Sequence, residues 1–129
     1  MDKTLTLKLK EFKQALNTLL KALKIRKNEL VRDSVIKRFE YSYELLWKCT
    51  KIFLSDKYGI AASSPKECFR TLKKMQLISE KDTELLLLMA DDRNEVIHTY
   101  QEKFSKYLYK KINKNYYILM DKIYNIIKS

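Results

Sequence analysis

The residues best equipped for chemistry lie in one short segment that contains the only histidine of the chain. Residues 91–100 read DDRNEVIHTY, so that Arg93 and Asn94 precede His98 and Tyr100 follows it. An imidazole transfers protons near neutral pH, and a guanidinium can hold the extra negative charge of a phosphorane. The 2′-hydroxyl of RNA is a nucleophile built into the substrate. The segment therefore suits phosphodiester cleavage that requires no metal.

The spacing of this segment limits how its side chains can meet. Positions five apart on an unbroken α-helix point about 140° away from each other, so Arg93 and His98 do not share a face. Asn94 and His98 are four apart and do share one. Either the helix loosens near Ile97, or the imidazole and the guanidinium meet across a symmetric dimer. We favour the dimer.

A purely structural interpretation of the same segment stays open. A single histidine at a helix end is more often a cap or a solvated surface group than a catalyst. Arg93 could pair with Glu95 or Asp92, its neighbours in the sequence, and then have no chemical role.

Several other kinds of site are excluded by composition. The chain has one glycine, whereas a P-loop and a Rossmann fingerprint each need several for close approach of the backbone to phosphate. A nucleotidyltransferase needs a Gly-Ser loop and clustered acidic residues, and no Gly-Ser pair accompanies Asp91 and Asp92. With one histidine and two separate cysteines, Cys49 and Cys68, no zinc site can be assembled. We expect two buried, reduced thiols and no cofactor.

The charge of the chain is positive and concentrated at its two ends. The net charge is +11: residues 1–32 carry nine basic and three acidic side chains, residues 33–100 eleven of each, and residues 101–129 seven and two. Basic ends favour attraction to RNA or another polyanion. A lysine-rich composition typical of an AT-rich genome would give the same charge without any function.

The periodicity of apolar residues predicts a single all-α domain over residues 1–129. Apolar side chains recur at spacings of three and four, and one glycine and one proline leave little material for tight turns. No secretion signal or membrane-spanning run is visible, which predicts a cytoplasmic protein without membrane contact. The predicted apolar faces are Leu5, Leu9, Phe12, Leu16, Leu19 and Leu23; Val35, Phe39, Tyr43, Leu46 and Phe53, with Trp47 alongside; Cys68, Leu72 and Met75; Leu85, Leu88, Met89 and Val96; and Phe104, Leu108, Ile112, Tyr116, Leu119 and Ile123.

Capping residues place the helix ends. Gly59 suits a left-handed C-cap, and Ser64-Pro65-Lys66-Glu67 has the pattern of a capping box. Short loops between the helices imply an antiparallel up-and-down bundle of four to five helices. The predicted helices span about residues 3–27, a stretch from a cap at Asp33 or Ser34 to about Tyr58, a short stretch after Ser64, a stretch that begins at Ser79, and about residues 101–127.

Three motifs in order resemble one known family. They are Phe39–Lys48 (FEYSYELLWK), Ser64–Glu67 (SPKE), and the pair Asp92-Arg93-Asn94 and His98-Thr99-Tyr100. Together they resemble the nucleotidyltransferase substrate-binding proteins of the HEPN superfamily (higher eukaryotes and prokaryotes nucleotide-binding), over nearly the whole chain.

This resemblance implies a homodimeric toxin that is paired with a minimal nucleotidyltransferase as its antitoxin. The toxin of such a pair is a metal-independent RNA endonuclease whose Arg-x4-His motif lines the dimer cleft. Carried over, Arg93 and His98 are the catalytic pair and Asn94 is a polar helper. The antitoxin in some pairs attaches AMP to the tyrosine two positions after the histidine, which here is Tyr100. AMP at that position would add bulk and negative charge beside the RNA site.

Two other functions stay open. The family name suggests a non-catalytic subunit that presents a substrate to its nucleotidyltransferase, so that His98 does no chemistry. A structural helical adaptor is the second possibility. The six tyrosines from Tyr100 onward could stack on bases, although tyrosines at helical spacing more often belong to a core or a dimer interface.

Overall fold

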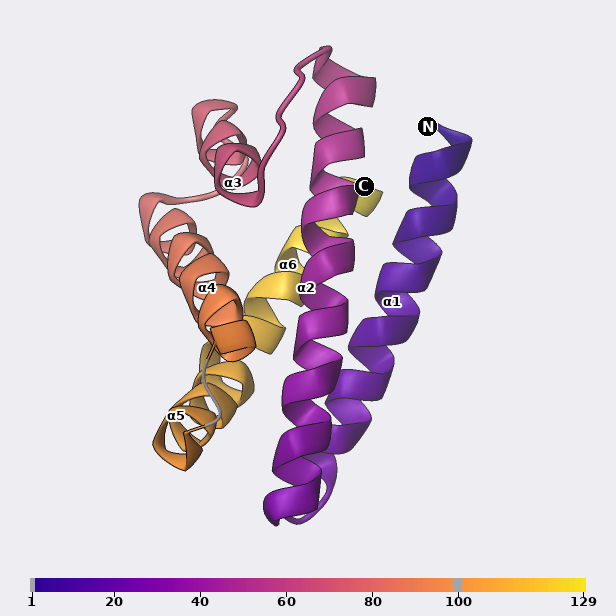
Figure 1. Ribbon diagram of the computed structural model, residues 1–129. Coiled ribbons are helices and arrows are strands. Elements are labelled where there is room, and N and C mark those ends of the chain that lie inside the picture. The colour runs from indigo at the N-terminus through magenta and orange to yellow at the C-terminus, as the bar shows by residue number, and fades with distance from the viewer. Residues whose placement is uncertain (1, 99–100) are drawn as a thin grey trace.

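The chain is helical throughout the part that its computed structural model describes. That part covers residues 2–98 and 101–129, apart from the side chain of His98. All regular elements within it are helices, which confirms the predicted all-α class (Figure 1). The elements are α1 (Lys3–Lys24), α2 (Glu29–Tyr58), α3 (Pro65–Lys74), α4 (Glu80–His98), α5 (Glu102–Lys111), a π-helical turn η1 (Ile112–Tyr116) and α6 (Tyr117–Lys128).

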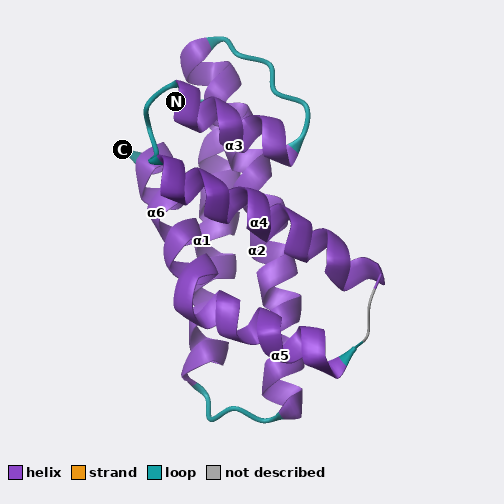
Figure 2. Cartoon of the chain, turned by 90° about the vertical axis from the view of Figure 1, so that its left-hand side faces the viewer, coloured by secondary structure: helices purple, strands orange, loops and turns teal. Residues whose placement is uncertain are grey.

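The long helices α1 and α2 form an antiparallel hairpin that organises the bundle. Figure 1 shows them side by side, with α6 behind them and α3 and α4 on the other flank of α2. In Figure 2, α5 lies below α4 on the face that is turned to the viewer. The apolar faces of the helices meet in one core. Its largest fully buried side chains include Phe12 of α1, Phe39 of α2, Phe69 of α3 and Tyr116 of η1. The arrangement confirms the predicted antiparallel bundle.

Most of the predicted caps are present. Gly59 has a φ of 66° and ends α2 in the left-handed conformation. The hydroxyl of Ser64 accepts a hydrogen bond from the N–H of Glu67 at 3.3 Å. The reciprocal half of this capping box is displaced by one residue, because the Glu67 carboxylate accepts from the N–H and the hydroxyl of Ser63, both at 3.0 Å. Ser79 caps α4 as predicted.

Two predicted helix ends were wrong. The α2 helix begins at Glu29, well before the predicted cap at Asp33 or Ser34, because the side chain of Asn28 accepts from the N–H of Val31 at 2.8 Å. A cap that comes earlier in the chain satisfies the first amides, and the later polar residues then lie inside the helix. The α1 helix ends at Lys24 rather than near residue 27, since Ile25 is already extended.

The predicted last helix of residues 101–127 is interrupted by η1. Its predicted apolar residues Phe104, Leu108, Ile112 and Tyr116 follow one another in steps of four. On a regular α-helix each such step turns the side chain about 40° further around the axis. The wider π-turn absorbs this drift. As a result, Ile112 and Tyr116 both point into the core and are fully buried.

The core face of α4 was only partly predicted. Met89 is buried as expected, but Leu85, Leu88 and Val96 are half-buried. Residues 85–88 are four consecutive leucines, and such a run gives no periodicity that selects one face. Among the described side chains of α4, the buried ones are Thr83, Leu86, Met89, Ala90 and Asp92.

Both cysteines are buried free thiols, as predicted. Burial raises the pKa of Cys49 to about 12 and that of Cys68 to about 11, so both stay protonated at neutral pH. None of the described helices is long and apolar enough to cross a membrane.

Candidate functional site

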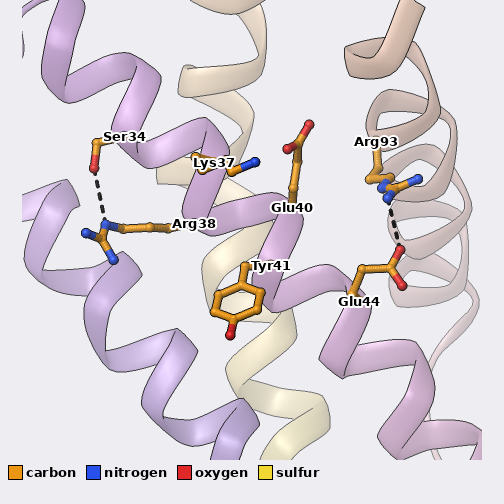
Figure 3. A pocket seen from close by; sticks show the side chains of 7 residues that line it. All are labelled: Ser34, Lys37, Arg38, Glu40, Tyr41, Glu44 and Arg93. Carbon is orange, nitrogen blue, oxygen red and sulfur yellow. Dashed lines mark hydrogen bonds and ion pairs between the residues drawn. The ribbon is translucent and has the colours of Figure 1, made fainter.

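Arg93 points from α4 toward α2 and is held there by Glu44. Its Nη2 lies 3.0 Å from Oε1 of Glu44, and both side chains are partly exposed (Figure 3). The other oxygen of the same carboxylate accepts a hydrogen bond from Nε1 of Trp47 at 3.2 Å and lies 3.8 Å from Nζ of Lys48. Within the described residues, neither Glu95 nor Asp92 pairs with Arg93, so the local pairing considered above is wrong.

The pair with Glu44 fixes the arginine without using all of its donors. A guanidinium has five N–H groups, and the recorded contact uses Nη2. The Nε atom of Arg93 is buried and has no hydrogen-bond partner among the described residues. That buried atom is closed to a ligand, so the groups suited to a phosphate are the terminal N–H groups of this planar cation.

Asp92, the preceding residue, leaves α4 about 100° further around its axis and is buried. One oxygen of its carboxylate, Oδ2, accepts a hydrogen bond from the hydroxyl of Tyr107 at 2.9 Å and another from that of Tyr116 at 2.5 Å. Tyr116 in turn stacks on Phe39 of α2, with ring centroids 5.7 Å apart. This cluster, which we call the Asp92 cluster, attaches the end of α4 to α5, η1 and α2.

The two tyrosines of the Asp92 cluster remain protonated. Burial, followed by the hydrogen bond to Asp92, raises the pKa of Tyr107 to about 12 and moves that of Tyr116 in the same direction. Because these pKa values are raised in the folded state, the stability that the protonated tyrosines contribute is fully present at a pH below about 10, the ordinary tyrosine pKa. That stability is lost as the pH rises through the folded-state pKa.

Removing one hydroxyl of this cluster should destabilise the fold. For Tyr116→Phe we expect a loss of about 1–3 kcal/mol in the free energy of unfolding, because the buried carboxylate of Asp92 keeps only the hydroxyl of Tyr107. Tyr124→Phe is the matched control, since its ring rather than its hydroxyl makes the described contacts. Urea denaturation measures both. Equal stability of the two variants would contradict a stabilising role of the cluster.

Arg93 lies between two surface hollows. One, of about 410 Å³, also contains Asn94, which is exposed. The other, of about 500 Å³, is seen in Figure 3 and is open along α2. The first is lined by Tyr43, Glu44, Trp47, Ser64, Pro65, Lys66, Ala90, Arg93 and Asn94, and the second by Ser34, Lys37, Arg38, Glu40, Tyr41, Glu44 and Arg93.

The backbone of α4 is regular up to its last residue, His98. The helix therefore does not loosen near Ile97, and positions 93 and 98 lie about 140° apart around its axis. The His98 side chain and Tyr100 lie outside the described residues, so their predicted roles are not tested by the structure. Among the described side chains, no three His, Cys, Asp or Glu residues group as metal ligands would.

Comparisons with solved structures found close matches to the fold. A Thermus thermophilus protein known from its crystal structure has a TM-score of 0.86 and 29% identity, covering 92% of this chain and 99% of that one. The tri-AMPylated HEPN toxin of Shewanella oneidensis, in complex with its MNT antitoxin, has a TM-score of 0.80 and 17% identity, covering 99% and 98%. A toxin–antitoxin structure with AMP-PNP has a TM-score of 0.80 and 15% identity, covering 100% and 99%.

Sequence comparison gives the family. A search of curated proteins found no match. A family profile described as "Nucleotidyltransferase substrate binding protein like" matches residues 7–129, nearly the whole chain. The profile names the same family as the three sequence motifs, and the matched toxin structures have the fold that those motifs implied. The chain therefore belongs to the family of nucleotidyltransferase substrate-binding-like proteins.

Proposed function

We propose that this protein is a HEPN toxin that cleaves RNA without a metal ion. The observation that carries the proposal is Arg93, whose guanidinium Glu44 holds at the edge of two hollows. In this mechanism the imidazole of His98 moves the proton of the attacking 2′-hydroxyl or of the leaving oxygen. Arg93 stabilises the phosphorane, and Asn94 contributes a polar contact.

The active form is a homodimer in this proposal. Because α4 is regular, positions 93 and 98 of one copy lie about 140° apart around the helix axis. Two copies related by a twofold axis place the same surface patch opposite itself. The arginine of one subunit can then face the histidine of the other over one scissile phosphate.

Its regulator in this proposal is a minimal nucleotidyltransferase. Support comes from the similar folds, one of which is an AMPylated toxin bound to its MNT antitoxin. AMP on Tyr100 would place a negative charge two residues from His98. Such a charge repels the RNA backbone, which explains how a modification could silence the site.

Growth of a host that expresses the chain tests the proposal. We expect the wild-type protein to arrest growth, and His98→Ala and Arg93→Ala to relieve the arrest, because each removes one half of the catalytic pair. Arg70→Ala is the matched control for loss of an arginine, since Arg70 is exposed on α3 and lines neither hollow. Colony counts after induction, at equal protein levels, are the measurement. Arrest by all three variants would remove the nuclease hypothesis.

A substrate-binding subunit is the second candidate function. The family description names it, and the hollow of about 410 Å³ joins an indole, a guanidinium and an amide from Trp47, Arg93 and Asn94. Titration calorimetry with nucleotides distinguishes the two functions. A saturable nucleotide site that Trp47→Ala abolishes, together with no turnover of RNA, would favour this candidate.

A further inference from the structure

The segment that follows α4 carries a line of lysines on its outer face. Lys103, Lys106, Lys110 and Lys114 recur at spacings of three and four along α5 and η1, so they form one stripe on the helix surface. All four side chains are exposed. At the helical rise of 1.5 Å per residue, the lysine stripe is roughly 16 Å long.

The lysines of the chain fall into two groups by ion pairing, and the stripe lysines belong to the group without an acidic partner among the described residues. Six lysines elsewhere form ion pairs with carboxylates: Lys8, Lys13, Lys48, Lys66, Lys73 and Lys122. None of the four stripe lysines does so among the described residues. The stripe is set apart by its place beside α4 rather than by its lack of ion pairs.

The acidic side chains nearest in sequence are engaged elsewhere. Residues 101–129 contain two, Glu102 and Asp121. Glu102 lies 3.5 Å from the buried Arg32 of α2, and Asp121 lies 3.6 Å from Lys13 of α1. The stripe therefore keeps its positive charge, which exposed ion pairs would otherwise offset.

The stripe also adjoins the candidate catalytic helix. Tyr107 stands beside it and donates its hydroxyl to Asp92, the residue before Arg93. Tyr107 is 37% exposed, so part of its ring faces solvent. A hollow of about 220 Å³ is lined by Tyr107, Lys110, Lys111, Lys114 and Asn115. Cations in a line with an aromatic ring between them are the features that bind single-stranded nucleic acid.

We infer that the lysine stripe binds the sugar–phosphate backbone of single-stranded RNA and guides it to the catalytic cleft. Lys103, Lys106, Lys110 and Lys114 contact successive phosphates, and the exposed edge of Tyr107 contacts a base. The inference rests on the proposed function for the identity of its ligand. It adds a binding surface separate from Arg93, Asn94 and His98. Contacts of this kind supply affinity without reading the sequence.

The salt dependence of RNA binding tests this inference. The His98→Ala protein serves as the parent, so that a labelled oligoribonucleotide stays intact during the titration. In the stripe variant, all four stripe lysines are replaced by Gln. We expect the slope of log K against log salt to become shallower by about 0.7 for each lost phosphate contact, or nearly 3 for four. The effect should be alike for oligonucleotides of unrelated sequence.

A variant with the same loss of charge on another helix provides the control. Lys3, Lys10, Lys21 and Lys24 are exposed on α1, and their replacement by Gln should change the slope by much less. Equal slopes for the two quadruple variants would overturn the inference. So would a stripe variant that binds RNA normally but no longer binds a nucleotidyltransferase. If the quadruple variant does not fold, Lys106→Gln and Lys110→Gln singly should each lower the slope by about 0.7.

Failure of the proposed function would look different. If RNA binding depends on the stripe but the wild-type protein never cleaves the RNA, the nuclease proposal is contradicted and the RNA-binding surface is kept. If the protein cleaves RNA but the salt dependence of RNA binding is the same with and without the stripe lysines, the nuclease proposal is kept and the RNA-binding surface is contradicted.

Discussion

A mixture of the Arg93→Ala and His98→Ala proteins should recover cleavage that neither variant shows alone. Loss of a general acid or base costs about 10²–10⁴-fold in rate, and loss of one charge-stabilising group about 10²–10³-fold. If Arg93 of one subunit acts with His98 of the other, a mixed dimer contains one intact site and one site that lacks both groups. Equal mixing then gives about a quarter of the wild-type activity, because half of the dimers are mixed and each has one of two sites.

The measurement is single-turnover cleavage of a labelled RNA in the presence of a chelator, before and after subunit exchange. A mixture of Arg93→Ala with Arg93→Ala, Arg70→Ala is the control, since no pairing of those chains restores an arginine at position 93. Exchange is followed independently by native mass spectrometry with one isotopically labelled partner. Full exchange without recovery would show that each site takes both groups from one chain, against the geometry of α4.

Phe39→Ala should lower the free energy of unfolding by about 3–5 kcal/mol, a large part of the stability of a domain of this size. Phe39 is fully buried, stacks on Tyr116 and lies with its ring centroid 6.3 Å from that of Tyr43. Its removal leaves a cavity between α2 and the Asp92 cluster. The loss therefore includes both the transfer of the ring and the contacts of its neighbours.

Tyr41→Ala is the matched control for this substitution. It removes an aromatic ring two residues further along the same helix, where the side chain is 67% exposed, and should change stability by about 0.5 kcal/mol or less. Urea denaturation with a common m-value compares the two. Similar midpoints for Phe39→Ala and Tyr41→Ala would mean that the core does not depend on this ring.

Local patterns were sufficient to predict most of the bundle. The stripe Leu5, Leu9, Phe12, Leu16 and Leu19 is fully inside, as its spacing predicted. Gly59 and Ser64 mark helix ends because their preferences act within a few residues and need no tertiary partner. In these parts of the fold, the helical spacing of the residues and their burial indicate the same helix faces and the same helix ends.

The errors arise where several local patterns are equally acceptable. Four consecutive leucines fit any face of α4, and Asp33 or Ser34 is as good a cap by type as Asn28. The π-turn is not encoded by any single residue. It follows from the packing of Tyr116 against Phe39 and Asp92, which come from two other helices.

The sequence singles out the segment around Arg93 as a candidate site, but it does not predict the contacts that Arg93 and Asp92 make. The segment around Arg93 was found because it gathers rare functional side chains. Its ion-pair partner Glu44 lies 49 residues earlier, within the resembling motif Phe39–Lys48, and nothing in the spacing joins the two positions. Asp92 was considered as a neighbour of Arg93. Its role as acceptor for two tyrosines depends on how α5 and η1 pack.

The π-turn also gives the C-terminal helix some tolerance in its length. Such a turn holds one residue more than the α-helical path needs, and Asn113 and Lys114 within it are exposed. A homologue that is one residue shorter here could close the turn into an ordinary α-helix and keep α6 aligned with α1. Closing the turn would rotate Tyr116 about the helix axis, and its hydroxyl would then lose the hydrogen bond to Asp92. We therefore expect homologues that lack one residue in this turn to lack the tyrosine–aspartate pair as well, and homologues that keep the turn to keep the pair.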